Sequence, residues 1–368
     1  MIKKKEKQKI VILSAGGSGG HIFPAEAVAE VLIDLGMRVI LITDSRFANF
    51  KTGALSGVEI KTIKTGTTVG SLPKKFLGIL SLALGIIQAR FLLAKLKPNC
   101  VVGFGGYPSF PTIFSASSLA IPTIIHEQNS VLGRANRLLA GKVNVIATSF
   151  VGTRLIAKKD HKKIMLIGNP VRASIQEVAK IPYQQIAPDG VINILVTGGS
   201  QGASIFSEVV PQAVALLQSD IQSRLHIIQQ CRQADVEKTR TLYDNIKVNA
   251  EIAAFFTDIP EKLARSHLVI ARAGASTIFE LAIAGRPAIL VPLPTSMDNH
   301  QYHNATAFAD VGGGWLISQD DFTAQSLAKQ LEELINTPDI LKKSAENARK
   351  LATDNSAEKL ANAIITLL

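Results

Sequence analysis

One short pattern occurs twice in this chain and constrains the fold more than any other feature. An apolar run at 10–13 leads into the glycine-rich loop 16–21, and a second run at 192–197 leads into the loop 198–203. Each loop is followed by residues that favour a helix. A strand that ends in glycines before a helix is typical of the first unit of an open parallel sheet. The duplication therefore predicts two Rossmann-like α/β domains.

The length of the chain and its other apolar runs agree with two domains. At 368 residues the chain is longer than one ordinary hydrophobic core supports. Further parallel strands are predicted at 38–43, 100–103, 122–125, 143–147, 164–167, 225–229, 267–271 and 287–291. We expect one domain over 1–169, a second over 170–351, and a C-terminal helix of about 352–368 that packs back on the first.

Net charge and composition narrow the class of partner. The net charge of +11 and the pI of about 9.6 favour a polyanionic partner: nucleic acid, an anionic membrane or a phosphorylated ligand. Aromatic residues are only 5% of the chain, which argues against a stacking platform for single-stranded nucleic acid. No helix-turn-helix or zinc-finger pattern is present, so we expect no nucleic-acid partner.

Cysteine usage and the N-terminus predict an intracellular protein. Cys100 and Cys231 lie in apolar, strand-like runs and give neither a disulfide framework nor a metal-binding spacing. The basic segment 1–9 is followed by an apolar run that is far too short for the hydrophobic region of a signal peptide. We therefore expect the mature chain to begin inside the cell.

Residues 72–97 are unusually apolar for a surface segment. The part from 77 to 87 carries no charge, and basic residues flank or interrupt the stretch at Lys74, Lys75, Arg90, Lys95 and Lys97. The uncharged run is shorter than the roughly 18 residues expected of a spanning helix. Two interpretations stay open: a buried helix between two strands, or a partly exposed apolar surface with basic rims that lies on an anionic bilayer.

The segment 271–304 suggests the chemistry of a ligand. Its helix begins among small residues and hydroxyls at 274–277, and such a helix N-terminus attracts phosphate. One turn later Glu280 is placed to accept hydrogen bonds from a ribose, and the polar residues 298–301 suit a sugar. Phosphate, ribose and sugar in one row predict a nucleotide-sugar. The spacing Thr277-x-x-Glu280 also fits a capping box, which is a purely structural role.

Seven motifs in one order resemble a single family. They are GGSGGHIFPA at 16–25, GFGGYPSFP at 103–111, HEQN at 126–129, GNPVR at 168–172, GGSQGA at 198–203, RAGASTIFE at 272–280 and DNHQYHNA at 298–305. Over nearly its whole length the chain is similar to MurG, a family of N-acetylglucosaminyltransferases of peptidoglycan synthesis. The resemblance implies a GT-B architecture, in which two Rossmann-like domains face a cleft. The N-terminal domain would face the acceptor and the membrane, and the C-terminal domain would bind the UDP-sugar.

The resemblance also implies a reaction and a setting. N-acetylglucosamine would pass from UDP-N-acetylglucosamine to the 4-hydroxyl of undecaprenyl-diphospho-N-acetylmuramyl-pentapeptide (lipid I), with inversion, to give lipid II. The enzyme would be peripheral to the cytoplasmic face of the bacterial inner membrane, beside other cell-wall synthesis proteins. Asp-x-Asp, the usual metal–diphosphate motif of the other large glycosyltransferase fold, is absent from this chain, and position 130 is Ser, which excludes an H-E-x-x-H zinc site. We expect no metal and no cofactor.

Site residues follow from the matching motif positions. The resemblance implies donor contacts at Ser18, Gly19, Gly20, Asn129 and Arg172, a diphosphate contact at Ser200, and a backbone contact to uracil at Phe256. It further implies that the helix-start segment of Ala275, Ser276, Thr277, Ile278, Phe279 and Glu280 binds the donor, with Glu280 on the ribose. Gln301 would contact the N-acetylglucosamine hydroxyls.

Inverting transfer needs a base for the acceptor hydroxyl. His21 is the first candidate, because it ends the first glycine loop and has an ordinary pKa near 6.5. The alternative is a histidine that only satisfies the start of the helix near Pro24. Glu127 is the reserve candidate, and it has a structural alternative as the organiser of its loop. We expect Arg172 and the helix start at Ala275 to stabilise the departing diphosphate.

Three other functions remain open on the sequence alone. The first is another GT-B enzyme that uses a UDP-sugar with a different acceptor. The second is a UDP-N-acetylglucosamine 2-epimerase, which shares the architecture and transfers nothing. The third is a basic, membrane-attached module that binds the nucleotide-sugar without turning it over.

Overall fold

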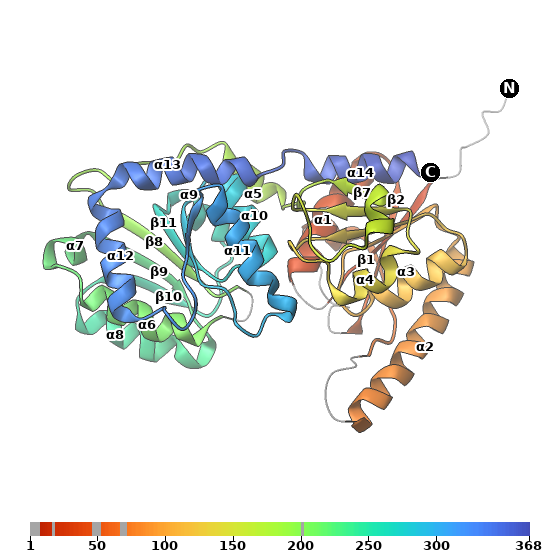
Figure 1. Cartoon of the computed structure of the whole chain (residues 1–368), viewed down its shortest axis with the longest axis horizontal. Helices are drawn as coiled ribbons and strands as arrows, with labels where there is room; N and C mark the ends of the chain where they lie inside the picture. The colour runs from red at the N-terminus through yellow and green to blue at the C-terminus, as the bar shows by residue number, and fades with distance from the viewer. Residues whose placement is uncertain (1–7, 17–18, 46–52, 67–71, 200–201) are drawn as a thin grey trace. The chain divides into compact units, whose positions relative to one another are not determined.

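The computed structural model describes residues 8–16, 19–45, 53–66, 72–199 and 202–368. The chain divides into two compact units (Figure 1). The first unit is residues 1–172 together with 353–368, and the second is 173–352. The expected boundary after residue 169 lies three residues before this division.

The first unit is built on a seven-stranded parallel sheet in the order β3-β2-β1-β4-β5-β6-β7. Its strands are β1 (Ile10–Ser14), β2 (Arg38–Thr43), β3 (Glu59–Thr62), β4 (Cys100–Gly103), β5 (Thr123–Glu127), β6 (Val145–Thr148) and β7 (Ile164–Leu166). The helical segments of the unit are α1 (Gly19–Asp34), η2 (Gly53–Gly57), α2 (Leu72–Leu96), α3 (Ser109–Ser118), α4 (Arg134–Ala140), η3 (Lys158–Lys163) and α14 (Ser356–Thr366).

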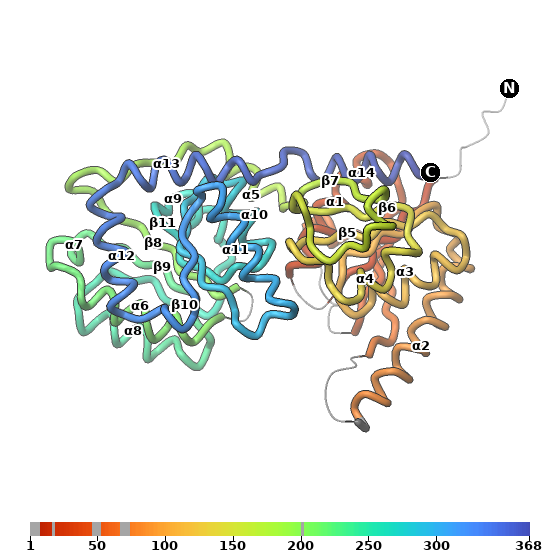
Figure 2. The backbone as a smooth tube through the Cα atoms, viewed as in Figure 1, coloured from red at the N-terminus to blue at the C-terminus, as the bar shows by residue number. Residues whose placement is uncertain are grey.

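Both faces of this sheet are covered, because successive side chains of a strand point to opposite faces. Val11 and Leu13 of β1 belong to a core shared with α1 and α14, whose Leu360 is fully buried. Ile12 belongs to a separate core on the other face, with side chains of α2, α3 and α4. The chain thus returns to its first unit at the C-terminus, and Figure 2 shows α14 running beside α1.

The second unit repeats the plan with a six-stranded parallel sheet in the order β10-β9-β8-β11-β12-β13. Its strands are β8 (Ile192–Thr197), β9 (Leu225–Gln230), β10 (Asn249–Ala253), β11 (Leu268–Ala271), β12 (Ala288–Leu290) and β13 (Gly314–Leu316). Its helical segments are α5 (Ala173–Ala179), α6 (Ser204–Ala215), α7 (Ser219–Arg224), η4 (Gln233–Asp235), α8 (Val236–Asn245), α9 (Ile259–Arg265), α10 (Ala275–Ala284), η5 (Met297–Asn299), α11 (His300–Asp310), α12 (Ala324–Asn336), α13 (Pro338–Ala348) and η6 (Arg349–Leu351).

Three strands were missed by the apolar-run criterion, namely β3, β10 and β13. Each is an outermost strand of its sheet. Outer strands bury less of their surface, so their sequences need not be continuously apolar, as in Glu59–Thr62. The strands predicted from apolar runs are all present, with ends that shift by one or two residues.

The first helix begins earlier than predicted. We expected a start near Pro24, but α1 begins at Gly19 and Pro24 lies inside it. A proline at that depth cannot donate to the carbonyl four residues earlier, which normally disfavours a helix. The buried side chains Ile22, Ala25 and Leu32 pack α1 on the sheet and outweigh this cost. As a result, His21 lies in the first turn of the helix rather than in a loop.

Helix α2 is only partly buried. Ala89 and Leu93 pack into the core of the first unit, whereas Phe76 and Phe91 are 70% and 73% exposed. Other exposed apolar side chains are Leu77, Ile79, Leu80, Leu84 and Ile87. By length and composition Lys74–Leu96 is the one described helix long enough to cross a membrane, and 22% of its apolar window is buried. The start of α2 projects from the rest of its unit (Figure 2). The buried-helix interpretation is therefore wrong for most of its length.

Candidate active site

Each sheet changes the direction of its strand order beside its first strand. β1 lies between β2 and β4, and β8 lies between β9 and β11. Open parallel α/β sheets bind ligands outside the carboxyl ends of the strands at such a point. The predicted glycine loops follow β1, β4 and β8, and the start of α10 follows β11. All four segments therefore lie at the expected binding edges.

The glycine loops after β1 and β4 pack directly against each other. Gly106 has φ +78°, and a Cβ atom there would collide with the carbonyl of Gly16. Gly105 has φ +95°, and its Cβ atom would lie 2.8 Å from Cε1 of the His21 imidazole. Only glycine has the backbone freedom and the small size that these two contacts require. The second glycine loop thus forms one wall against His21.

His21 and the polar segment after β5 come together. The Nδ1 atom of His21 lies 3.2 Å from Oε1 of Gln128, across 107 residues of chain. Gln128 is buried, and His21 is half-buried in the first turn of α1. Gly19 and Gly20 precede His21 in the same turn, whereas Ser18 lies outside the described residues. The predicted base, His21, therefore contacts the buried side chain of Gln128 and is still partly exposed to solvent.

Glu127 organises the loop that follows its strand. Its Oε1 atom accepts hydrogen bonds from the backbone N–H and the side-chain amide of Asn129, both at 3.1 Å. Its Oε2 atom accepts from the N–H of Gly133 and from Asn136 Nδ2, both at 2.8 Å. The carboxyl group is 2% exposed, so these four donors occupy it in place of water. This geometry favours the loop-organising alternative for Glu127 over a role as base.

Two further residues of the first unit that were predicted to contact the donor, Asn129 and Arg172, are held by neighbouring side chains. Asn129 is oriented by its bond to Glu127. The guanidinium of Arg172 lies 4.2 Å from the centroid of the Phe23 ring, a cation–π contact. A Cβ atom on Gly19 would lie 2.8 Å from the same ring. Phe23 thus connects the first turn of α1 to Arg172.

In the second unit, the N-terminus of α10 has no capping side chain. Gly274 is the N-cap and offers no side-chain cap, and the first helical hydrogen bond runs from Ile278 N–H to Gly274 O. The N–H groups of 275–277 therefore have no partner within the helix. The buried Oγ atom of Ser276 also has no hydrogen-bond partner. Hydroxyl and N–H donors in one turn suit an anion.

The capping-box interpretation of Thr277 and Glu280 is wrong. A capping box requires Thr277 at the N-cap, but Thr277 lies inside α10. Ile278 and Phe279 are fully buried, so they can offer a ligand only backbone groups. Glu280 is half-buried and lies one turn further along the same helix. The end of α10 is as predicted, since Gly285 adopts the left-handed conformation at φ +62°.

Phe256 and Gln301 are both fixed by neighbouring polar groups. The Phe256 ring is 7% exposed and lies 4.7 Å from the ammonium of Lys262, which also bonds Glu251 and Asp258 at 2.9 Å. Gln301, the second residue of α11, accepts a hydrogen bond from Leu293 N–H at 3.0 Å. Phe256 lies in the loop after β10, and Gln301 lies in the first turn of α11, in the segment that follows β12. Ser200 lies outside the described residues.

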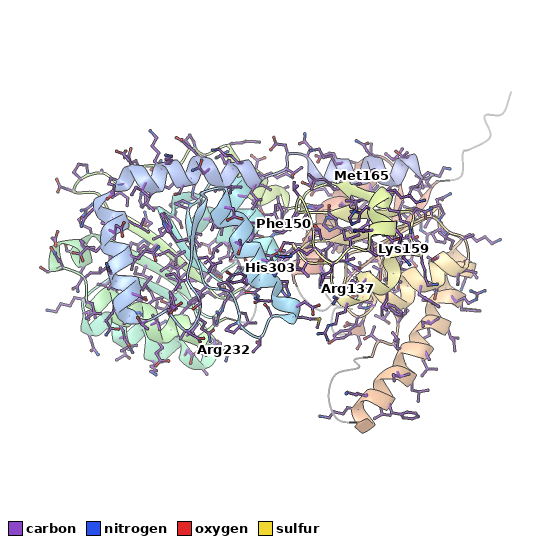
Figure 3. The ribbon with its side chains drawn as sticks, viewed as in Figure 1. Arg137, Phe150, Lys159, Met165, Arg232 and His303 are labelled. Atoms are coloured by element: carbon purple, nitrogen blue, oxygen red, sulfur yellow. The ribbon has the colours of Figure 1, made fainter. Side chains whose placement is uncertain are left out.

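Sequence reasoning assigned no role to three residues that shape these sites. Gln128 contacts His21, Lys262 supports Phe256, and Arg232 packs on the third glycine loop, where a Cβ atom on Gly202 would lie 3.0 Å from its N atom. Figure 3 shows Arg232 beyond the end of β9 and His303 on α11. The position of Arg232, directly after a predicted strand, was an available signal. Among the described residues, no group of three His, Cys, Asp or Glu side chains is arranged to hold a metal ion.

Comparison with protein families gives the identity of both units. Residues 11–148 match the glycosyltransferase family 28 N-terminal domain, and residues 193–363 match the glycosyltransferase family 28 C-terminal domain. The chain belongs to glycosyltransferase family 28. Within it, the chain is 48% identical over 98% of both lengths to the UDP-N-acetylglucosamine--N-acetylmuramyl-(pentapeptide) pyrophosphoryl-undecaprenol N-acetylglucosamine transferase of Paramagnetospirillum magneticum. The expected membership of the MurG family is confirmed.

Solved structures agree with this family. The crystal structure of Acinetobacter baumannii MurG matches with a TM-score of 0.78 and 29% identity, over 97% of this chain and 99% of that one. The predicted GT-B architecture is confirmed by the two parallel-sheet units and this match. The UDP-GlcNAc 2-epimerase of Neisseria meningitidis also matches, with a TM-score of 0.64 and 14% identity over 97% of this chain and all of that one. At that identity the likeness shows the shared fold alone.

Because His126 is buried, we expect the free energy of unfolding of this protein to depend on pH. Burial lowers the pKa of His126 from its ordinary value of 6.5 to about 4, against the opposing effect of its bond to Gly168 O. Between pH 6.5 and 4 the unfolded chain takes up a proton here that the folded chain does not. Stability should therefore fall as the pH decreases through this range. Urea unfolding, followed by circular dichroism at several pH values, measures it.

A His126→Gln variant should show a smaller loss of stability over the same pH range. His161→Gln, the same change at an exposed position of the same unit, serves as the matched control. An unchanged pH dependence in His126→Gln would contradict the assignment of this effect to His126.

Proposed function

We propose that this family 28 enzyme catalyses the reaction for which its curated relatives are named. N-acetylglucosamine passes from UDP-N-acetylglucosamine to the 4-hydroxyl of the N-acetylmuramyl-pentapeptide carried on undecaprenyl diphosphate. The products are UDP and a β-linked disaccharide on the lipid. The observation that carries the residue-level proposal is the uncapped N-terminus of α10, where the Ser276 hydroxyl is buried without a hydrogen-bond partner.

The donor diphosphate binds at the start of α10 in this proposal. Three free N–H groups, the Ser276 hydroxyl and the helix dipole supply donors and positive potential for the charge that develops as UDP leaves. Glu280, one turn on, accepts hydrogen bonds from the ribose hydroxyls. The backbone beside Phe256 meets the uracil, and Gln301 meets the sugar.

Residues of the first unit complete the donor contacts and supply the base. Gly19, Gly20, Asn129 and Arg172 bind the donor, together with Ser18 of the first loop, and Ser200 of the second unit contacts the diphosphate. His21 removes the proton from the acceptor hydroxyl as its oxygen bonds to the anomeric carbon and the bond to UDP breaks. Both electrons of the broken bond leave with the diphosphate, and the anomeric configuration inverts because the hydroxyl attacks the face opposite to the leaving UDP.

The mechanism predicts a catalytic defect without a binding defect at His21. His21→Ala should lower kcat by roughly 10²- to 10⁴-fold, the usual contribution of general-base catalysis, with little change in the Kd for UDP-N-acetylglucosamine. Release of UDP is measured with and without a lipid I analogue, and with and without EDTA. The wild-type enzyme should require the acceptor and should be unaffected by EDTA.

The controls of this assay separate the competing functions. His161→Ala, at an exposed position of the first unit, should turn over as the wild type does. Tight donor binding without acceptor-dependent release of UDP would contradict the transferase and favour an epimerase or a binding module. A change in kcat of less than about threefold in His21→Ala would exclude His21 as the base.

Binding of the donor should depend on Glu280. Glu280→Ala should weaken the Kd for UDP-N-acetylglucosamine by roughly 10- to 150-fold, since a hydrogen bond to a charged group contributes about 1.5–3 kcal/mol. Isothermal titration calorimetry measures the affinity. Glu261→Ala, at an exposed glutamate on α9, is the matched control. Unchanged affinity in Glu280→Ala would remove the residue from the site.

We further propose that the enzyme is peripheral to the cytoplasmic face of the plasma membrane, where it meets its lipid-linked acceptor and other cell-wall synthesis proteins. The exposed apolar side chains of α2 support this, because several of them lie together on one helix, whereas isolated exposed apolar residues are common on soluble proteins. Lys74, Lys75 and Arg90 lie exposed on the same helix and would be attracted to anionic headgroups. The first unit would therefore face the membrane and the acceptor.

Charging this surface should release the protein from membranes. Leu80→Glu with Leu84→Glu should reduce co-sedimentation with anionic vesicles by at least about tenfold, because each leucine that the membrane would bury contributes about 1.5–3 kcal/mol to binding. Val191→Glu with Leu216→Glu makes the same change at exposed apolar positions of the second unit and should leave binding intact. Retained vesicle binding by the α2 variant would contradict the proposal. Thermal unfolding of both variants checks that the fold is preserved.

A further inference from the structure

A continuous chain of hydrogen bonds runs from His21 into the interior of the first unit. His21 Nδ1 contacts Gln128 Oε1 at 3.2 Å, and Gln128 Nε2 contacts His126 Nδ1 at 3.0 Å. His126 Nε2 contacts the carbonyl of Gly168 at 3.0 Å. Gln128 and His126 are 1% and 0% exposed, so protein groups rather than water complete these bonds.

Two backbone carbonyls set the direction of every bond in this chain. The carbonyl of Phe104 can only accept, and it lies 2.8 Å from Gln128 Nε2, so the amide nitrogen must point there. The same NH₂ group has a second hydrogen for His126 Nδ1. The carbonyl of Gly168 likewise requires that His126 Nε2 carries the hydrogen. His126 is then neutral with Nδ1 as acceptor, which fits its pKa of about 4.

The orientation of Gln128 leaves only its oxygen for His21. An amide oxygen accepts and cannot donate, so the hydrogen between the two residues must lie on His21 Nδ1. The other ring nitrogen, Nε2, then carries the lone pair whenever the imidazole is neutral. The backbone of Gly105 packs closely on the same ring, since a Cβ atom there would lie 2.8 Å from Cε1 and 2.9 Å from Nδ1 of His21.

We propose that Gln128 is a positioning residue that holds the His21 imidazole in its Nδ1–H tautomer, so that Nε2 is the atom that accepts the proton of the acceptor hydroxyl. The inference deepens the proposed role of His21 as base and rests on it for its catalytic consequence. The tautomer itself is independent of that role. A hydrogen bond at Nδ1 fixes the tautomer and the orientation of a histidine ring, and it puts the basic lone pair of the neutral ring on Nε2.

The tautomer can be measured directly on the wild-type enzyme. Two-bond ¹H–¹⁵N correlation spectra of ¹⁵N-histidine-labelled protein distinguish Nδ1–H from Nε2–H imidazoles, and a His21→Gln variant assigns the His21 signals. The expected result at about pH 8, above the ordinary histidine pKa, is Nδ1–H for His21 and Nε2–H for His126. Observation of Nε2–H at His21 would overturn the proposal without any need for a Gln128 variant.

The catalytic part is tested with Gln128→Met, which keeps the length of the side chain and removes the acceptor. His21 should lose its single Nδ1–H signature, and kcat should fall by at least about tenfold, up to the loss seen in His21→Ala. The KM for UDP-N-acetylglucosamine should change by less than about threefold. Gln229→Met, at a fully buried glutamine of the second unit that bonds Tyr243, is the matched control and should keep the wild-type kcat.

The outcomes separate this inference from the role of His21. An Nδ1–H signature that persists in Gln128→Met would show that other groups fix the tautomer and would overturn the proposal. Loss of the signature with unchanged kcat would overturn the catalytic part. If His21→Ala itself turns over normally, the base assignment fails, and the tautomer shift in Gln128→Met still decides whether Gln128 holds the ring.

Discussion

Parallel pairing on both sides of β1 and of β8 is the constraint on which the candidate site depends. Because all strands of each sheet point the same way, every loop at their carboxyl ends emerges at one edge. The order reverses at β1 and β8, so the loops on the two sides diverge and leave room for a ligand. The described parts of the glycine loops and the start of α10 follow these strands.

Within the first unit, the adjacent residues Glu127 and Gln128 contact different parts of the structure. Glu127 turns inward and uses both oxygens to hold the loop that carries Asn129. Gln128 reaches across the sheet edge to His21 and is itself fixed by the carbonyl of Phe104. A carboxylate that already accepts four hydrogen bonds is a poor base, whereas a neutral imidazole that donates from Nδ1 carries its lone pair on Nε2.

In the second unit the candidate site is formed by the N-terminus of a helix, whereas in the first unit it is formed by hydrogen-bonded side chains. The N-terminus of α10 lacks a capping side chain, although serine and threonine lie within its first turn. A helix normally gains about 1 kcal/mol from such a cap. Leaving the N–H groups and the Ser276 hydroxyl unbonded costs stability in the absence of a ligand, and it provides a ready anion site in its presence. The exposed apolar surface of α2 is a comparable local cost that a membrane would offset.

The sequence alone determined the two-sheet plan, the binding edges and the family, because apolar runs, glycine loops and motif order are local properties. It also placed the end of α10 at Gly285 and identified His21 as a base candidate. It missed the outer strands β3, β10 and β13, whose modest burial leaves little apolar pattern, and it began α1 too late, because packing of Ile22 outweighs the local effect of Pro24. Only the tertiary structure showed that Gln128 contacts His21 and that both oxygens of Glu127 accept hydrogen bonds within its own loop. The contact of Gln128 joins residues 107 positions apart, and no local pattern carries that information.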